Sequence, residues 1–294
     1  MTSRSVLAAT LTCLALVAVP RVLDAQRAAV QTFATPEEAV HALAAAAAAS
    51  NLDQLLAIFG PSSQELVGSS DAATARRNRD VFTVAIAEGW HLVDQGPTRK
   101  TLVIGNENWP FPVPLVKSAN RWRFDTAAGK EEVLARRIGR NELAVIAICG
   151  AYVKAQRHYA EQGHDGKPAG LYATVLRSDT GKQNGLYWPT ARGQARSPLG
   201  DLVAQAAEEG RPLGTDPEHP SPFHGYYFRI LPSPGGFGFV AWPVEYDASG
   251  VMTFIVNQDG VVREKDLGPK THAAVAAMTG YNPDASWRPV ASAR

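Results

Sequence analysis

The sequence has little cysteine and no surplus of charge of either sign. Its 294 residues include two cysteines, Cys13 and Cys149, and 29 basic against 28 acidic residues. A chain of this balance lacks the positive field that nucleic acid or an anionic membrane surface attracts, so neither is expected as a partner. Cys149 stands in an apolar stretch, a position typical of a small buried side chain rather than of a catalytic thiol.

The sequence also lacks the short motifs that mark metal sites and common catalytic centres. Its seven histidines show no zinc-ligand spacing, and His158 and His164 do not share a helical face. No Gly-x-Ser-x-Gly, Ser-x-x-Lys or phosphate-binding glycine loop occurs. We therefore predict no catalytic residue, no metal site and no cofactor. A pair of glycosidase carboxylates that only the fold brings together would leave no such motif, so a hydrolase stays open.

The first 25 residues form a secretory signal pattern rather than a membrane span. Arg4 gives a basic start, Val6 to Val19 is mainly apolar, and Leu23-Asp24-Ala25 ends on a small residue. The apolar run is shorter than the roughly 20 residues that a bilayer-spanning helix needs. We predict a signal peptide over residues 1–25, a periplasmic or secreted protein, and no stable membrane anchor after cleavage.

Residues 33–128 are predicted to form a small domain that begins with helices. Thr35 is a good helix cap, Pro36 suits the first helical position, and Glu38 is placed to reach back over the cap. The alanine-rich stretch that follows strongly favours a helix. The spacing therefore predicts a helix that begins at Pro36.

The same domain is predicted to end in an antiparallel sheet. From His91 the apolar pattern changes to a period of two, and Ser118-Ala119-Asn120 marks a hairpin. Phe111–Val116 is predicted as an edge strand, because its two prolines lack the N–H groups that a central strand needs. In Arg121–Phe124 the two aromatic residues are expected to share one face of the sheet. The layout resembles nuclear-transport-factor-like and cystatin-like cones, a resemblance that implies fold alone.

Residues 131–290 are predicted to form a second domain around a long helix, Arg140–Gly163. Apolar residues recur at spacings of three and four, and Leu143, Ile146 and Val153 are expected on its main buried face. Ile148, Cys149, Tyr152 and Tyr159 are expected to widen that face. Thr126–Lys130 is interpreted as a joint, and Gly139 as an interruption before the helix.

The rest of this domain is predicted to be an antiparallel meander that covers the helix. Its strands are expected at His224–Leu231, Gly236–Pro243, Thr253–Val256 and Val261–Glu264, separated by turn residues. Asp259-Gly260 is the strongest hairpin signal among the turns. The whole chain is thus predicted to be α+β: a small helix-plus-antiparallel-sheet unit, then a long helix packed on a meander.

Aromatic residues are concentrated in this second domain. Alternation along the strand predicts that His224, Tyr226 and Phe228 share one face and that Tyr227 lies on the other. One set is expected in the core and the other partly exposed, where it would suit a protein or glycan partner. The possible partner-binding residues are Trp188, His224, Tyr226, Tyr227 and Trp242.

Two resemblances follow from these segments. The second domain resembles the globular part of pseudopilins and pilins in Asn141-Glu142-Leu143, Gly225–Phe228, Ala241-Trp242-Pro243 and Thr253–Val262. From Phe33 to Val290 the chain more closely resembles a bacterial domain-of-unknown-function family, number 2950. The segments that carry this resemblance are FATPEEAV, WPFPVPLVK, WRFDTAAG, RRIGRNELA, GLYWP, FHGYYFRIL and TFIVNQDGVVREKDLGP. It implies an exported protein and no known activity.

These observations favour a non-enzymatic envelope protein that binds a protein or cell-wall partner or takes part in an assembly. The alternative is a periplasmic hydrolase or carbohydrate-modifying enzyme with a site near the aromatic strands. A third hypothesis is a small-molecule binder that uses the cone of the first domain.

Overall fold

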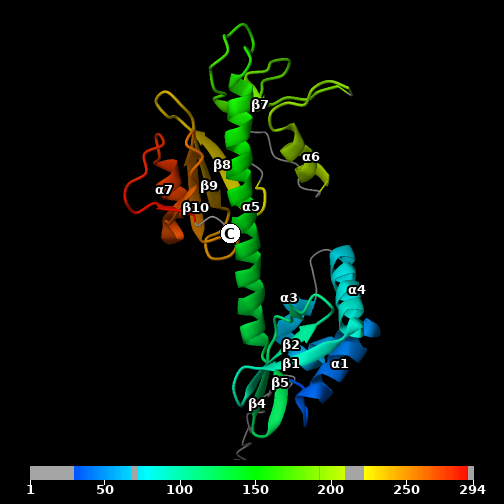
Figure 1. The fold of residues 1–294 in the computed structure, drawn as a ribbon. Helices are drawn as coiled ribbons and strands as arrows, with labels where there is room; N and C mark the ends of the chain where they lie inside the picture. Colours follow the sequence, from blue (N-terminus) through cyan, green and yellow to red (C-terminus); the bar gives the residue numbers. More distant parts are fainter. Residues whose placement is uncertain (1–29, 68–71, 192, 209–221, 291–294) are drawn as a thin grey trace, which may run out of the picture. The chain divides into compact units, whose positions relative to one another are not determined.

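A computed structural model describes residues 30–67, 72–191, 193–208 and 222–290 (Figure 1). It confirms the α+β class, with helices and mainly antiparallel sheets. The chain divides into two compact units, Met1–Thr126 and Ala127–Arg294. The predicted signal peptide lies outside the described residues.

The described part of the first unit begins with four α-helices and one 3-10 turn. They are α1 (Pro36–Ala48), α2 (Leu52–Phe59), η1 (Pro61–Ser63), α3 (Gln64–Val67) and α4 (Ala72–Glu88). The predicted start of α1 is confirmed, because Thr35 Oγ1 accepts a hydrogen bond from Glu38 N at 3.1 Å. Glu38 Oε2 in turn accepts one from Ala34 N at 2.9 Å, so two N–H groups at the helix start are satisfied.

An antiparallel sheet follows these helices. Its strands are β1 (Trp90–Asp94), β2 (Arg99–Ile104), β3 (Trp109–Pro110), β4 (Leu115–Ser118) and β5 (Arg121–Phe124). The order is β1-β2-β4-β5, and β3 pairs with β2. The predicted hairpin is confirmed, since Ala119 and Asn120 have the positive φ angles of a tight turn. The predicted edge strand from Phe111 is wrong: β4 begins only after Pro114, since the prolines cannot donate to a ladder.

The core of the first unit lies between its helices and one face of this sheet. Trp122 and Phe124 share one face of the sheet as predicted. Both are buried there, packed with Val40, Leu43, Ile58, Phe59, Leu102 and Leu115. Thr126, the last residue of the unit, donates its Oγ1–H to the carbonyl oxygen of Phe59 at 2.6 Å. All the buried residues described in this core come from the first unit.

The long helix α5 runs from Thr126 to Ala160 (Figure 1). The predicted start at Arg140 is wrong, and Gly139 does not interrupt the helix. A single helical glycine costs only about 1 kcal/mol relative to alanine, which the rest of a long helix easily offsets. The small residues between Thr126 and Lys130 include good helix formers and are helical rather than a joint.

The buried face of α5 is rotated from the predicted one. Leu143 is 65% exposed, whereas Val145, Cys149 and Tyr152 are fully or almost fully buried. The stripe continues through Gln156 to Tyr159, at spacings of three and four. Gln156 is polar, but both ends of its amide are paired: its Nε2 donates to Tyr152 Oη and Ala173 O, and its Oε1 accepts from Ala173 N.

After α5, the described residues of the second unit form a short parallel pair, two α-helices, one 3-10 turn and a five-stranded antiparallel sheet. These elements are β6 (Val175–Arg177), β7 (Gly185–Tyr187), α6 (Gly200–Glu208), β8 (Tyr226–Leu231), β9 (Gly238–Pro243), β10 (Met252–Asn257), β11 (Arg263–Asp266), η2 (Gly268–Lys270), α7 (Thr271–Ala276) and β12 (Arg288–Pro289). The sheet order is β12-β11-β10-β9-β8, so the predicted meander is confirmed.

The two faces of this sheet have different coverings. Its inner face packs on α5, with Tyr152 stacked on Phe239 at 4.0 Å between ring centroids. Its outer face packs partly on α7 and Trp287, around Leu231, Val240 and Ile255. Arg229 Nη2 holds the end of α7 by donating to Val275 O at 2.6 Å. Side chains at alternate strand positions therefore belong to two separate clusters.

Candidate functional site

The structure does not bring the five predicted partner-binding residues together in one site. Tyr226 is fully buried in the core between α5 and the sheet. Its hydroxyl donates to Met252 O at 2.9 Å and lies 3.4 Å from Glu142 Oε1. Burial and the neighbouring Glu142 charge raise the pKa of Tyr226, so the phenol stays protonated. Tyr226 therefore stabilises the fold and presents no surface to a partner.

The residues around Tyr226 form a polar clamp between α5 and the turn that joins β9 to β10. Glu142 Oε1 accepts hydrogen bonds from the backbone N–H groups of Val251 at 3.0 Å and Met252 at 2.9 Å. Asn141 Nδ2 donates to Ser249 O at 2.8 Å. A Cβ atom on Gly250 would lie 2.0 Å from the Tyr226 hydroxyl, so this position accepts only glycine without rearrangement.

His224 lies in a turn, not on the predicted strand. Phe223 and Tyr226 exchange two backbone hydrogen bonds, at 2.9 and 3.0 Å, across His224 and Gly225. Both central residues have positive φ angles, 46° and 72°, as a tight hairpin turn of this kind requires. The prediction that His224 shares a face with Tyr226 is wrong, because β8 begins only at Tyr226. Its ring packs on Phe223 at 4.2 Å between centroids.

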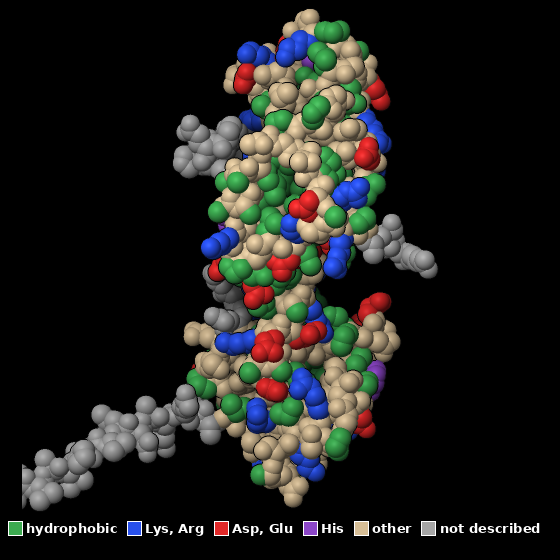
Figure 2. Space-filling model, turned by 90° about the vertical axis from the view of Figure 1, so that its left-hand side faces the viewer, with side chains coloured by type: hydrophobic (Ala, Val, Ile, Leu, Met, Phe, Trp, Pro, Cys, Tyr) green, Lys and Arg blue, Asp and Glu red, His purple; other side chains and the backbone are tan. Residues whose placement is uncertain are grey.

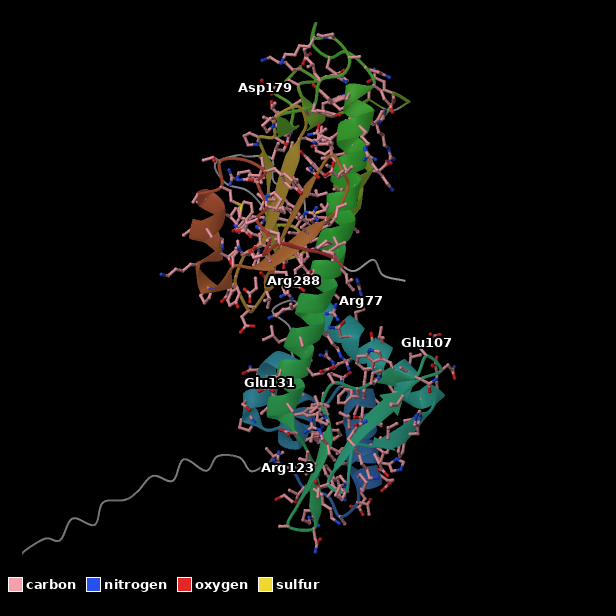
Figure 3. The ribbon with its side chains drawn as sticks, turned by 60° about the vertical axis from the view of Figure 1, so that its left-hand side comes forward. Arg77, Glu107, Arg123, Glu131, Asp179 and Arg288 are labelled. Carbon is pink, nitrogen blue, oxygen red and sulfur yellow. The ribbon has the colours of Figure 1, made fainter. Side chains whose placement is uncertain are left out.

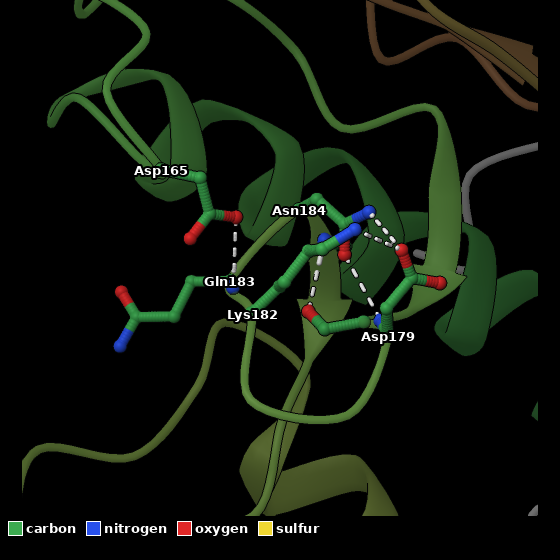
Figure 4. Close-up of polar contacts among 7 residues, drawn as sticks. Asp165, Asp179, Lys182, Gln183 and Asn184 are labelled. Atoms are coloured by element: carbon green, nitrogen blue, oxygen red, sulfur yellow. Dashed lines mark hydrogen bonds and ion pairs between the residues drawn. The ribbon is translucent and has the colours of Figure 1, made fainter.

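Trp188 lies among the loops that follow α5. Its ring is 5.7 Å from that of His164, which stacks on Tyr159 at 4.0 Å. Close by in the chain, Asp165 Oδ2 accepts from Gln183 N at 2.9 Å (Figure 4). Figure 4 also shows the Asp179 carboxylate bound by the side chains of Lys182 and Asn184, both at 3.0 Å. These contacts order the loops around Trp188 and give the polar side chains a structural role.

Tyr227 and Trp242 come together on the outer face of the sheet. They are opposite each other in the register of β8 and β9, and their rings are 5.7 Å apart at 42°. His272, from the first turn of α7, joins them: its ring is 5.9 Å from Tyr227, and its Nδ1 accepts from Trp242 Nε1 at 3.4 Å. We call Tyr227, Trp242 and His272 the outer aromatic cluster.

The ring nitrogens of His272 are oriented by their two partners. An indole N–H only donates, so Nδ1 is the acceptor and Nε2 carries the hydrogen. Nε2–H donates to Val244 O at 2.9 Å, which ties α7 to the chain after β9. Tyr227 and Trp242 are half-buried, and His272 is exposed. No sequence pattern pointed to His272, because it is brought to the strands only by the packing of α7.

Polar groups lie in the chain segments that follow β9 and precede α7. Tyr246 donates its hydroxyl hydrogen to Asp266 Oδ2 at 3.3 Å, and Asp266 Oδ1 accepts from Gly268 N at 2.7 Å. Glu245, Asp247 and Lys270 are exposed nearby in the chain. Figure 2 views the side on which α7 lies in Figure 1 and shows hydrophobic side chains exposed among charged ones.

Two further observations concern chemistry and membranes. Cys149 is fully buried, and burial raises the pKa of its thiol to about 12, so it is not a nucleophile at neutral pH. Within residues 30–290, as far as they are described, no group of three or more His, Cys, Asp and Glu side chains is placed to hold a metal ion. No helix in the same part of the chain is both long and apolar enough to span a bilayer.

Comparison with known proteins identifies one family. The sequence model of a family described as "Protein of unknown function (DUF2950)" matches residues 30–290, nearly the whole chain. No curated protein and no solved structure matches the chain.

Proposed function

The chain belongs to the family described as protein of unknown function (DUF2950), and from this premise we propose that it is an exported binding module of the cell envelope. Its role is to hold a protein or cell-wall partner, or to take part in an assembly, rather than to catalyse a reaction. The observation that carries this proposal is the outer aromatic cluster. Partly exposed Tyr and Trp side chains are enriched at binding surfaces because each combines a large apolar area with a polar group.

The remaining support comes from the sequence and from the burial of reactive groups. Residues 1–25 have the pattern of a secretory signal, which supports export. The one cysteine among the described residues is buried and protonated, and His224 occupies a turn position that backbone geometry explains. The order of a long helix followed by an antiparallel meander supports the resemblance to pilin-like proteins and thus a part in an assembly.

Export and binding are tested together in the native host. A tagged full-length chain should lose its first residues and appear in the envelope fraction, and affinity capture from that fraction should recover a partner. Trp242→Ala should reduce recovery, whereas Trp109→Ala, at an exposed tryptophan of the first unit, should not. Tyr226→Ala is an unsuitable probe because it removes a fully buried side chain. An uncleaved chain found only with cytoplasmic proteins would contradict the proposal.

A further inference from the structure

The strand β1 lies at one edge of the first unit's sheet and pairs with β2 alone. In an antiparallel ladder every second residue bonds to the neighbouring strand, and the residues between them direct their backbone groups to the other side. Just beyond the strand, Gln95 N donates to Arg99 O at 2.9 Å, so the odd-numbered residues of β1 bond to β2. The backbone N–H and C=O groups of Trp90, Leu92 and Asp94 therefore point away from β2. We call these groups the open edge of β1.

The open edge has no cover in the described part of the chain. No described group hydrogen-bonds to its N–H and C=O groups, and no described helix or strand other than β2 runs along β1. The opposite edge of the same sheet is closed, because Phe33 and Trp122 exchange two backbone hydrogen bonds at 2.8 Å. Proteins usually blunt an uncovered edge with proline, lysine or a bulge, since unpaired strands attract further strands. The regular strand Trp-His-Leu-Val-Asp has none of these devices.

The chemistry of the open edge selects an extended polypeptide as its occupant. Donors and acceptors recur along it at every second residue, about 7 Å apart, and another β-strand carries the complementary groups at the same spacing. The side chains of Trp90 and Leu92 pack against the buried cluster of the first unit. On the other face of the sheet, His91 and Val93 are exposed and would lie beside an added strand.

We propose that the open edges of two copies of this chain pair with each other as antiparallel strands about a two-fold axis. With Leu92 opposite Leu92 of the second copy, Trp90 lies opposite Asp94, and all the open groups of both strands find partners. On the exposed face His91 lies opposite Val93, so no two like charges face each other. This pairing closes both edges at once, whereas a foreign strand brings an open edge of its own. The dimer goes beyond the binding function proposed above and does not involve the outer aromatic cluster.

The test is the mass of the full-length chain in solution. Sedimentation equilibrium over a wide range of concentrations should show a reversible change from monomer to dimer. Val93→Lys adds a charge to each strand close to the two-fold axis and should weaken dimer formation about tenfold. The double variant His91→Glu with Val93→Lys places a carboxylate opposite each lysine and should restore most of the lost affinity, which a different register or a different interface would not do.

The matched control is Val133→Lys, which makes the same change at a valine of equal exposure, 38%, on α5 and should leave dimer formation unchanged. Circular dichroism establishes that each variant is folded.

Amide exchange of the wild type, followed by NMR, decides if Val93→Lys does not fold. Exchange at Leu92 should slow as the concentration rises, while exchange at His91, which bonds to β2, should stay the same. A chain that stays monomeric, equal effects of Val93→Lys and Val133→Lys, or a double variant that does not recover would overturn the inference. Protection of Leu92 only in the presence of a foreign protein would also overturn it. None of these results bears on binding by the outer aromatic cluster.

Discussion

Glu142 is the side chain that joins the long helix to the sheet. One of its carboxylate oxygens accepts two backbone N–H groups, from Val251 and Met252, and lies within reach of the Tyr226 hydroxyl. Hydrogen bonds to a charged acceptor contribute more than neutral ones, and partly buried N–H groups left without an acceptor are costly. The clamp therefore fixes the position of the turn between β9 and β10.

We expect Glu142→Gln to lower the free energy of unfolding by about 1–3 kcal/mol, because the amide loses the charge and part of the accepting capacity. Urea denaturation followed by circular dichroism measures the change. Glu131→Gln is the matched control: Glu131 is exposed on the same helix (Figure 3) and should change stability by less than about 0.5 kcal/mol. Equal effects of the two substitutions would show that the clamp is unimportant.

Cys149 gives a second prediction at this scale. Since burial raises the pKa of its thiol to about 12, the reactive thiolate is almost absent at neutral pH and the sulfur is shielded from reagents. Iodoacetamide should leave Cys149 unmodified in the folded protein and modify it rapidly in concentrated urea. Mass spectrometry of the peptide that contains Cys149 reports both. Fast modification under native conditions would mean that the core around Tyr152 opens readily.

The candidate site could be predicted only in part from single residues. Alternation along β8 correctly separated Tyr227 from Tyr226, because a strand places successive side chains on opposite faces. Alternation alone does not say which face is covered, and Tyr226 is in fact the buried residue. No local sequence pattern indicated that His272 belongs to the cluster, since its contact with Trp242 depends on where α7 packs. His224 was misplaced because two residues with positive φ form the turn before the strand.

At the scale of elements, we expect opposite changes in stability when two glycines are replaced by alanine. One, Gly139, is in α5, and the other, Gly250, is in the turn between β9 and β10. Gly139 is helical, and a Cβ added there would meet no heavy atom within 4 Å, so Gly139→Ala should stabilise the protein by about 0.5–1 kcal/mol through helix propensity. Gly250 lies against Tyr226, and Gly250→Ala should destabilise the protein by about 1–3 kcal/mol through overpacking. Thermal unfolding of both variants measures the two shifts. A destabilising Gly139→Ala would indicate that the helix bends at that residue.

The starts of α1 and α5 show where local sequence signals are enough to predict the beginning of a helix. The start of α1 was predictable because Thr35, Pro36 and Glu38 act within one helical turn of each other. The start of α5 was not, because Gly129 and Gly139 have weak helix preferences that the good helix formers around them outweigh. The buried stripe was misjudged for a related reason. Gln156 belongs to it through hydrogen bonds with Ala173, a contact that hydrophobic periodicity does not register.

At the scale of the whole molecule, the chain contains separate hydrophobic cores. The first unit has a core built on Phe124, Leu115 and the helices before the sheet. The second has one cluster between α5 and the sheet, around Tyr152 and Phe254, and another beneath α7. Among the described residues, none belongs both to the first unit's cluster and to either cluster of the second. Each unit therefore has its own source of stability.

Separate cores predict that damage to one unit stays in that unit. Phe124→Ala and Phe254→Ala each remove a fully buried ring and should cost about 3–5 kcal/mol. Hydrogen exchange with mass spectrometry should show Phe124→Ala accelerating exchange in β2, β4 and β5 while the strands β8–β10 keep their protection, and Phe254→Ala should give the reverse. Cooperative loss of protection in both units after either substitution would contradict independence. The alanine variants serve as controls for each other, because they make the same chemical change in two different cores.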